Sequence, residues 1–120
     1  MSNYKISRDI VSRHAAGERD LRNLELDDGV HDFENCNLQH AISAGSFLLA
    51  NFRNANLQGA DFSTCNVKAC DFSGARLAGA TFRNAAIDGA IFVDADLRRT
   101  NFEGACAYGH VLAEGQLPDH

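Results

Sequence analysis

The sequence predicts an all-β solenoid, in which the chain winds into stacked coils. Large apolar residues recur at every fifth position across residues 52–102, and a small residue lies two positions before each of them. A strict period of five matches neither the 3.6-residue period of a helix nor the two-residue period of a flat strand. A fixed short repeat that runs through most of a chain is typical of architectures in which each unit packs only on its neighbours.

The repeating unit reads small residue, Asn or Asp, large apolar residue, and then two residues that are polar or Gly. Eleven consecutive units carry the large residue in phase: Phe52, Leu57, Phe62, Val67, Phe72, Leu77, Phe82, Ile87, Phe92, Leu97 and Phe102. The small residues are Ala50, Ala55, Ala60, Cys65, Cys70, Ala75, Ala80, Ala85, Ala90, Ala95 and Thr100. Over roughly residues 19–107 this unit resembles the A-(D/N)-L-x-x repeat of the pentapeptide repeat family.

The resemblance implies a right-handed quadrilateral β-helix of about four to five coils, with one pentad on each side and four pentads in each coil. Coils stacked about 4.8 Å apart pair their backbones along the axis. The large residues fill the inside, where only a small residue fits beside them. Because Phe alternates with aliphatic residues, two ladders are expected on opposite sides: Phe52, Phe72 and Phe92 on one, and Phe62, Phe82 and Phe102 on the other.

The period of five is interrupted twice before residue 52. The first interruption lies near the start of the repeats. Leu21 and Leu26 keep the five-residue step, but Leu26 to Phe33 spans seven residues. We therefore interpret Gly29 and Val30 as a two-residue insertion. The surrounding segment, residues 27–32, is expected to be the most irregular part of the repeat region.

The second slip lies between Leu38 and Phe47, which are nine residues apart. Counting back from Phe52 predicts that Phe47 points inwards and that residues 41–44 form a shortened corner. Leu48 and Leu49 are then expected to point outwards. They either lie under the N-terminal helix, fill the irregular first coils, or form an apolar contact surface.

Both ends of a solenoid expose unpaired strand edges, which favour aggregation unless they are covered. Residues 1–18 are expected to cap the first coil with a helix over about 5–16, which ends at Gly17. The apolar stripe of this helix is Ile6, Ile10, Val11 and Ala15. Residues 19–107 then form the β-helix. Residues 108–120 either cap the last coil or pair two molecules end to end.

The composition predicts a single domain of 120 residues with a net charge of −5. No run approaches the ~18 apolar residues of a membrane span, and no secretory signal is present. We therefore expect a cytoplasmic protein without a membrane partner, and the family resemblance implies a bacterial one. Cys36, Cys65 and Cys70 occupy the small inward position, so we expect free, buried thiols rather than disulfides or a zinc site.

The chain carries no recognisable enzyme signature. The nearest group of reactive residues is His31, Asp32, Glu34 and His40, near the irregular corner. We keep a metal or catalytic site there as an alternative, but favour ordinary solvated residues. Because a packed, flat-sided rod offers no cleft for chemistry, we expect a protein that is not an enzyme and needs no cofactor.

The resemblance also suggests a function, since rods of the quinolone-resistance subgroup resemble duplex DNA and bind DNA gyrase. Such mimicry needs dense negative charge along the rod. Residues 50–105, however, carry six acidic and six basic residues, and the excess acidity lies in residues 18–34. A DNA-mimicking modulator of gyrase or topoisomerase is therefore the second choice. Nucleic-acid binding is not expected, because no basic face is predicted.

The favoured function is a rigid, non-catalytic protein-interaction module with an unidentified protein partner. Apolar residues at outward positions are informative exceptions on a polar surface. Ile91 and Val93 are either scattered surface residues, part of a partner or self-association patch, or anchors for the tail. The candidate interaction surface comprises Ile91, Val93, Tyr108, Val111, Leu112, Asp27, Asp28, Asp32 and Glu34. A homodimer through the C-terminal end is a further possibility.

Overall fold

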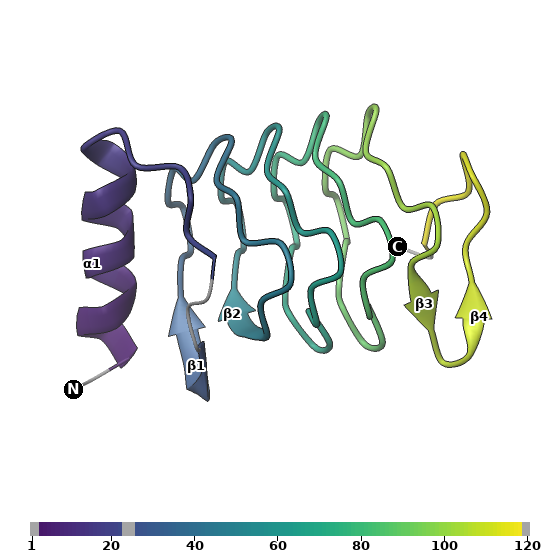
Figure 1. Ribbon diagram of the computed structural model, residues 1–120, viewed down its shortest axis with the longest axis horizontal. Coiled ribbons are helices and arrows are strands. Elements are labelled where there is room, and N and C mark those ends of the chain that lie inside the picture. The colour runs from purple at the N-terminus through teal and green to yellow at the C-terminus, as the bar shows by residue number, and fades with distance from the viewer. Residues whose placement is uncertain (1–2, 23–25, 119–120) are drawn as a thin grey trace.

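The computed structural model describes the backbone of residues 3–22 and 26–118, and the side chains of residues 6–22 and 30–118. Its elements are helix α1 (Asn3–Ala15) and strands β1 (Leu26–Asp32), β2 (Leu48–Asn51), β3 (Cys106–Ala107) and β4 (His110–Val111). In Figure 1, α1 stands at one end of the molecule and β3 and β4 at the other, with stacked loops of the chain between them.

The stacked loops are joined by parallel backbone pairing with a step of four pentads. β1 pairs in parallel with β2, and from Asn51 onwards the second residue of each pentad pairs with its equivalent four pentads later. These pairs are Asn51–Asp71, Asn56–Arg76, Asp61–Thr81, Asn66–Ala86, Asp71–Ile91, Arg76–Asp96, Thr81–Asn101 and Ala86–Cys106. The backbone therefore returns to the same side after four pentads. We term each such return a coil.

The Asn or Asp of a pentad fixes the corner that follows it. Oδ1 of Asp71 accepts a hydrogen bond of 2.9 Å from the backbone N–H of Ser73. The N–H of Ala75 donates to the carbonyl of Phe72 at 3.0 Å and closes a tight turn. Gly74, the last residue of the pentad, has a φ of 69°, a left-handed conformation that Gly adopts without steric cost. The repeat thus encodes a corner in every pentad.

The interior contains the two predicted Phe ladders. Neighbouring rings within a ladder are stacked: Phe33–Phe52, Phe52–Phe72 and Phe72–Phe92 on one side, and Phe62–Phe82 and Phe82–Phe102 on the other. Their centroids lie 4.9–5.3 Å apart. Rings of opposite ladders meet edge to face, as Phe72 does with Phe82 at 5.4 Å. Stacked and edge-to-face contacts are the favoured geometries of aromatic pairs, so the ladders confirm the expected arrangement.

The direction in which Phe47 and Leu48 point differs from the prediction. Phe47 is 49% exposed, whereas Leu48 is 4% exposed and belongs to the core. Leu49 is half-buried. Counting forward in fives from Leu38 leads to Leu48, whereas counting back from Phe52 leads to Phe47. Because both residues are large and apolar, the sequence alone did not distinguish the two phases.

The shortened corner accordingly lies in β2 and not at residues 41–44. Phe47 pairs with Asn66, whereas Asn51 pairs with Asp71, so the step along the chain is shorter by one at Phe47 than at Asn51. One residue is therefore missing from the repeat between Phe47 and Asn51. This shortening brings the chain into the phase that the eleven regular pentads then keep.

The irregularity in β1 lies where the sequence predicted an insertion. Leu26 pairs with Leu48, and His31 pairs with Ala50, with a shift of register between the two pairs. β1 has three more residues than β2 over this stretch. The insertion contributes two of them, and the missing residue of β2 accounts for the third.

The corrected phase places Ser43 where other pentads carry a large inward residue. Its N–H donates to the carbonyl of Asp61 at 3.0 Å, as the N–H of Phe52 does to that of Asp71. Ser43 lines a cavity of about 30 Å³ that Ile10 of α1 also lines. The small side chain thus leaves the core incompletely filled beneath the helix.

Ser43→Leu is expected to stabilise the protein, because the added methyl groups fill this cavity. Cavity-filling changes commonly raise the free energy of unfolding by about 0.5–2 kcal/mol. Thermal unfolding followed by circular dichroism measures the effect. Ser63→Leu is the matched control, since Ser63 lies in a half-exposed turn and should show no gain. A lower melting temperature for Ser43→Leu than for Ser63→Leu would contradict the corrected phase.

Helix α1 covers the first coil. It spans Asn3–Ala15, close to the predicted 5–16, and ends where Glu18 N–H donates to the carbonyl of Arg13 and Gly17 has a φ of 101°. The buried face includes Ile10 and two polar residues that the predicted stripe did not contain, Ser7 and His14. His14 Nε2 donates to the carbonyl of Gln39 at 2.8 Å and ties the helix to the first coil. Among the described residues, no helix has the length and hydropathy of a membrane span.

A short hairpin closes part of the opposite end. β3 and β4 pair in antiparallel orientation. Tyr108 and Gly109, whose φ angles are 51° and 81°, form the turn between them. Leu112 then folds back on the last coil, where its N–H donates to the carbonyl of Ala105 and its carbonyl accepts from the N–H of Gly104. The segment up to Leu112 therefore caps one side of the last coil.

Candidate interaction surface

Four apolar residues of the predicted surface are exposed near the C-terminal end. Ile91 is 43% exposed, Val93 48%, Tyr108 79% and Val111 60%. We term these four residues the C-terminal patch. Leu112, which was expected to belong to the same surface, is 5% exposed and is part of the core. It is buried because it caps the last coil, so the surface ends at Val111.

The fold itself favours a polar residue where the C-terminal patch has Ile91. Ile91 follows Asn51 and Asp71 in one column of paired positions. Asn51 accepts a hydrogen bond from Arg53 N–H at 3.0 Å, and Asp71 accepts one from Ser73 N–H at 2.9 Å. An Ile side chain has no acceptor for this bond. The apolar residue is therefore not required by the corner on which it lies.

A cavity of about 440 Å³ lies beside the C-terminal patch. Residues of the last coil and of the C-terminal segment line it, among them Ile87, Phe92, Tyr108, Leu112, Leu117 and Pro118. Its volume falls within the range of about 300–1,000 Å³ that is usual for ligand pockets. The flat-sided rod expected from the sequence thus has a hollow at its C-terminal end, which period counting did not predict.

The acidic part of the predicted surface lies at the other end of the molecule. Asp32 and Glu34 are exposed, and the side-chain amide of Asn51 donates to Glu34 Oε1 at 3.2 Å. The side chains of Asp27 and Asp28 lie outside the described residues. β1 contains Asp27, Asp28 and Asp32. Figure 1 shows this strand next to α1 and far from β3 and β4. The structure therefore does not combine the acidic residues with the C-terminal patch into one surface.

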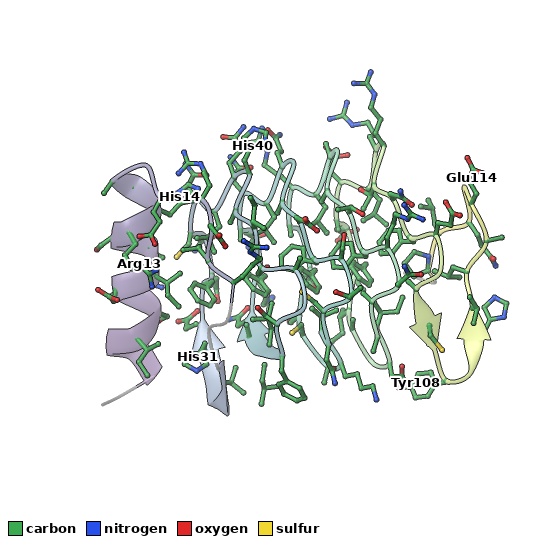
Figure 2. All side chains as sticks on the ribbon, in the orientation of Figure 1. Arg13, His14, His31, His40, Tyr108 and Glu114 are labelled. Carbon is green, nitrogen blue, oxygen red and sulfur yellow. The ribbon has the colours of Figure 1, made fainter. Side chains whose placement is uncertain are left out.

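The two histidines of the alternative metal or catalytic site do not converge. Figure 2 shows His40 on the upper edge of the rod and His31 on the lower edge, beside β1. His31 is 1% exposed, and neither ring nitrogen has a hydrogen-bond partner among the described residues. His40 is exposed at a corner with a φ of 62°. No group of three or more His, Cys, Asp or Glu side chains in the described part of the chain is arranged to hold a metal ion.

Ion pairs neutralise several carboxylates along the rod. Arg98 forms a salt bridge of 2.7 Å with Asp96 and lowers the pKa of that carboxyl to about 2 through its side-chain hydrogen bonds. Arg53 lies 3.9 Å from Asp71 on a neighbouring coil. These pairs are exposed and contribute little stability. They do reduce the negative charge that the rod presents to a partner.

The cysteines at the small inward position are free and buried. Cys65 Sγ donates to the carbonyl of Ser43 at 3.0 Å, and Cys70 Sγ donates to that of Leu48 at 3.3 Å. Burial raises the pKa of the Cys65 thiol to about 11 and that of Cys70 to about 12. Because the thiolate is the reactive form, neither thiol is set up for chemistry near neutral pH.

Cys65 and Cys70 are therefore expected to resist a thiol reagent such as Ellman's reagent at pH 8 while the protein is folded. Cys106 is half-buried and is expected to react first. The time course of thiol labelling, with the reacted sites identified by mass spectrometry, measures this order. The same experiment in denaturant should label all four cysteines rapidly. Fast labelling of Cys65 or Cys70 in the native protein would contradict their inward placement.

The family comparison agrees with the repeat. The sequence model of the family of pentapeptide repeats, which contains eight copies of the repeat, matches residues 32–74 and 65–104. No curated protein matches the chain.

Solved pentapeptide repeat proteins share the fold. Rfr23 from the cyanobacterium Cyanothece 51142 superposes with a TM-score of 0.68 and 24% identity, covering 73% of this chain and 59% of that protein. For alr5209 from Nostoc PCC 7120 the TM-score is 0.64 with 25% identity, covering 91% and 86%. For QnrB1, a plasmid-mediated fluoroquinolone resistance protein, it is 0.57 with 23% identity, covering 72% and 47%. The chain thus spans less than two thirds of Rfr23 and about half of QnrB1. With the family model matched over more than half of its length, the chain belongs to the pentapeptide repeat family.

Proposed function

We propose that the protein is a rigid, non-catalytic protein-interaction module that contacts its partner through the C-terminal patch. The observation that carries the proposal is the exposure of Ile91, Val93, Tyr108 and Val111 at one end of the rod. Contact surfaces are enriched in aromatic side chains at their centre, and clustered exposed apolar residues mark interaction sites.

The proposal includes the finer architecture that the family implies, a right-handed quadrilateral β-helix of about four to five coils. The parallel pairing with a step of four pentads in each coil supports it. Closely packed interiors resist compression, which suits a surface that must hold its shape. The proposal also includes the bacterial cytoplasm as the compartment, which free cysteines support because thiols stay reduced there.

Capture of partners from bacterial lysate tests the proposal. The wild-type protein is immobilised beside the variant Ile91→Asp/Val93→Asp and the control Phe47→Asp, which changes an apolar residue of similar exposure elsewhere on the rod. The expected result is a partner retained by the wild type and the control and lost from the patch variant. Equal capture by all three proteins would show that the C-terminal patch is not the contact surface.

The second candidate function, modulation of gyrase or topoisomerase by DNA mimicry, is supported by the fold shared with QnrB1. The balanced charge of residues 50–105 and the ion pair between Arg98 and Asp96 oppose it. A gyrase supercoiling assay distinguishes the two functions. Inhibition or protection of gyrase by the wild type and by Ile91→Asp/Val93→Asp alike would favour mimicry over an apolar contact.

A homodimer through the C-terminal end is the other way in which the patch could be covered. Sedimentation equilibrium at several protein concentrations measures it. A monomeric mass at every concentration would exclude the dimer and leave the patch available to a different protein.

A further inference from the structure

At the C-terminal face, most of the backbone ladder that joins the coils ends without a partner among the described residues. In an inner coil, the N–H of each large residue donates to a carbonyl of the next coil. Phe72 N–H donates to the carbonyl of Ile91 at 2.7 Å, and Leu77 N–H donates to that of Asp96 at 3.0 Å. The carbonyl of the small residue completes the pattern, as that of Ala75 does when it accepts from Asp96 N–H.

In the last coil the equivalent groups have no partner within the described residues. This is true of the N–H groups of Phe92, Leu97 and Phe102 and of the carbonyls of Ala90, Ala95 and Thr100. Two other positions of this coil are paired: Ile87 N–H and the carbonyl of Ala85 are bonded to Cys106, and Gly104 N–H and the carbonyl of Ala105 are bonded to Leu112. An open row of donors and acceptors is a template for an added strand.

The two ends of the rod therefore differ. α1 covers the N-terminal end and is held by His14 on the carbonyl of Gln39 and by Arg8 on that of Asp32. At the C-terminal end the chain covers the core, since Phe92 and Phe102 are 1% and 2% exposed, but does not pair with most of the edge. Figure 1 shows this contrast between the helix at one end and the short hairpin at the other.

The unpaired groups of the open edge come as neighbouring pairs of one carbonyl and one N–H, and we term each pair a station. The cavity of about 440 Å³ adjoins one such station. Ala90 and Phe92, which carry its carbonyl and its N–H, both line the cavity, as do Tyr108 and Leu117 from the C-terminal segment. A chain that paired with this station would therefore have an apolar hollow beside it for a side chain.

Acidic residues flank the same station. Asp88 precedes it and is half-exposed, and Asp94 follows it and is exposed. Neither carboxylate has a salt-bridge partner in the described part of the chain, unlike Asp96, which pairs with Arg98. These two carboxylates therefore place negative charge, without a salt bridge among the described residues, next to the edge, and this charge is complementary to a basic partner.

We propose that the C-terminal face binds an extended segment of a partner protein, which adds as a strand at Ala90 and Phe92. One apolar side chain of the segment enters the cavity, and a Lys or Arg beside it faces Asp88 or Asp94. This inference rests on the proposed interaction function and names the class of partner. The backbone edge supplies affinity, and the cavity and the two carboxylates select the sequence.

A second copy of the chain fits the face less well. The rod is about 25 × 23 Å in cross-section, so two end faces would bury on the order of 1,000 Å², at the lower limit for a specific interface. Such a pair would also set a hollow against a hollow and acidic residues against acidic residues.

Selection from a phage-displayed library of random heptapeptides on the immobilised protein tests the proposal. We expect enriched peptides with an apolar residue next to Lys or Arg. Their affinity should fall at least tenfold for Ala107→Phe, which fills the cavity from β3. It should fall about three- to tenfold for Asp88→Asn/Asp94→Asn, less so at high salt. Ala78→Phe and Glu103→Gln are the matched controls and should bind as the wild type does.

Amide hydrogen exchange tests the edge without changing the protein. In the free protein the amides of Phe92, Leu97 and Phe102 should exchange fast and that of Phe72 slowly. A selected peptide should protect the amide of Phe92, and N-methylation of its central amide should abolish binding.

Three outcomes would overturn the inference. They are the absence of enriched peptides, undiminished binding to Ala107→Phe, and protection of Phe92, Leu97 and Phe102 together with a doubled mass, which would assign the face to a second copy. The proposed function is judged separately by the lysate experiment. A partner that Ile91→Asp/Val93→Asp loses and Ala107→Phe retains would leave the interaction module standing and refute the strand at the edge.

Discussion

Replacing Phe72 with Ala is expected to lower the free energy of unfolding by about 3–5 kcal/mol, the usual cost of removing a buried Phe. Its ring is fully buried and stacks on those of Phe52 and Phe92 at 5.1 and 5.2 Å. It also meets Phe62 and Phe82 edge to face. Because coils on both sides are held in register by their own backbone pairs, they cannot collapse into the space. Urea unfolding followed by circular dichroism measures the loss.

Phe47→Ala is the matched control, since it removes the same side chain from a surface position. Phe47 is 49% exposed, so we expect a loss below about 1 kcal/mol. The pair of variants also tests the corrected phase, because the sequence pattern alone assigns both residues to the core. Similar losses for the two variants would show that Phe47 points inwards after all.

The regular pentads could be predicted from the sequence because the large inward residue recurs in all eleven of them, with a small residue two positions before it. In the pentad around Phe72, Asp71 caps Ser73, Phe72 fills the interior, and Gly74 takes the left-handed corner, so composition and geometry agree. The step of four pentads then determined which Phe residues share a ladder. For these residues, the local sequence pattern is sufficient to predict the tertiary contacts.

The remaining features depend on contacts that no period describes. Leu48 rather than Phe47 faces inwards because the chain must match the coil before it as well as the coil after it. Leu112 is buried because the hairpin of β3 and β4 turns it back on the last coil. His14 faces the core because the carbonyl of Gln39 gives it a partner. A sequence pattern of apolar residues does not reveal such a partner.

The same distinction applies to the candidate site. Ile91 and Val93 could be recognised from the sequence because they interrupt a polar pattern. The cavity and the open edge could not, because they arise where the pattern stops and the C-terminal segment fails to replace the next coil. Ala107 lies four pentads after Ile87, where a regular coil would carry another large residue, and both residues line the cavity.

Ala75→Leu is expected to destabilise the protein by about 1–3 kcal/mol or more, because the small inward position has no room for a branched side chain. Ala75 is fully buried, and its backbone lies in a column with those of Ala55 and Ala95, joined through hydrogen bonds to Arg76 and Asp96. Coils stacked about 4.8 Å apart leave space for a methyl group between them. A larger side chain must push the coils apart or leave its rotamer.

The midpoint of urea unfolding, with an unchanged denaturant slope, measures this loss. Ala78→Leu introduces the same side chain in the same pentad, at a half-exposed corner of the rod, and is expected to change stability by less than about 0.5 kcal/mol. An unchanged midpoint for Ala75→Leu would mean that the small residue does not lie inside. The repeat would then need another explanation, because inward packing would no longer account for a small residue two positions before each large one.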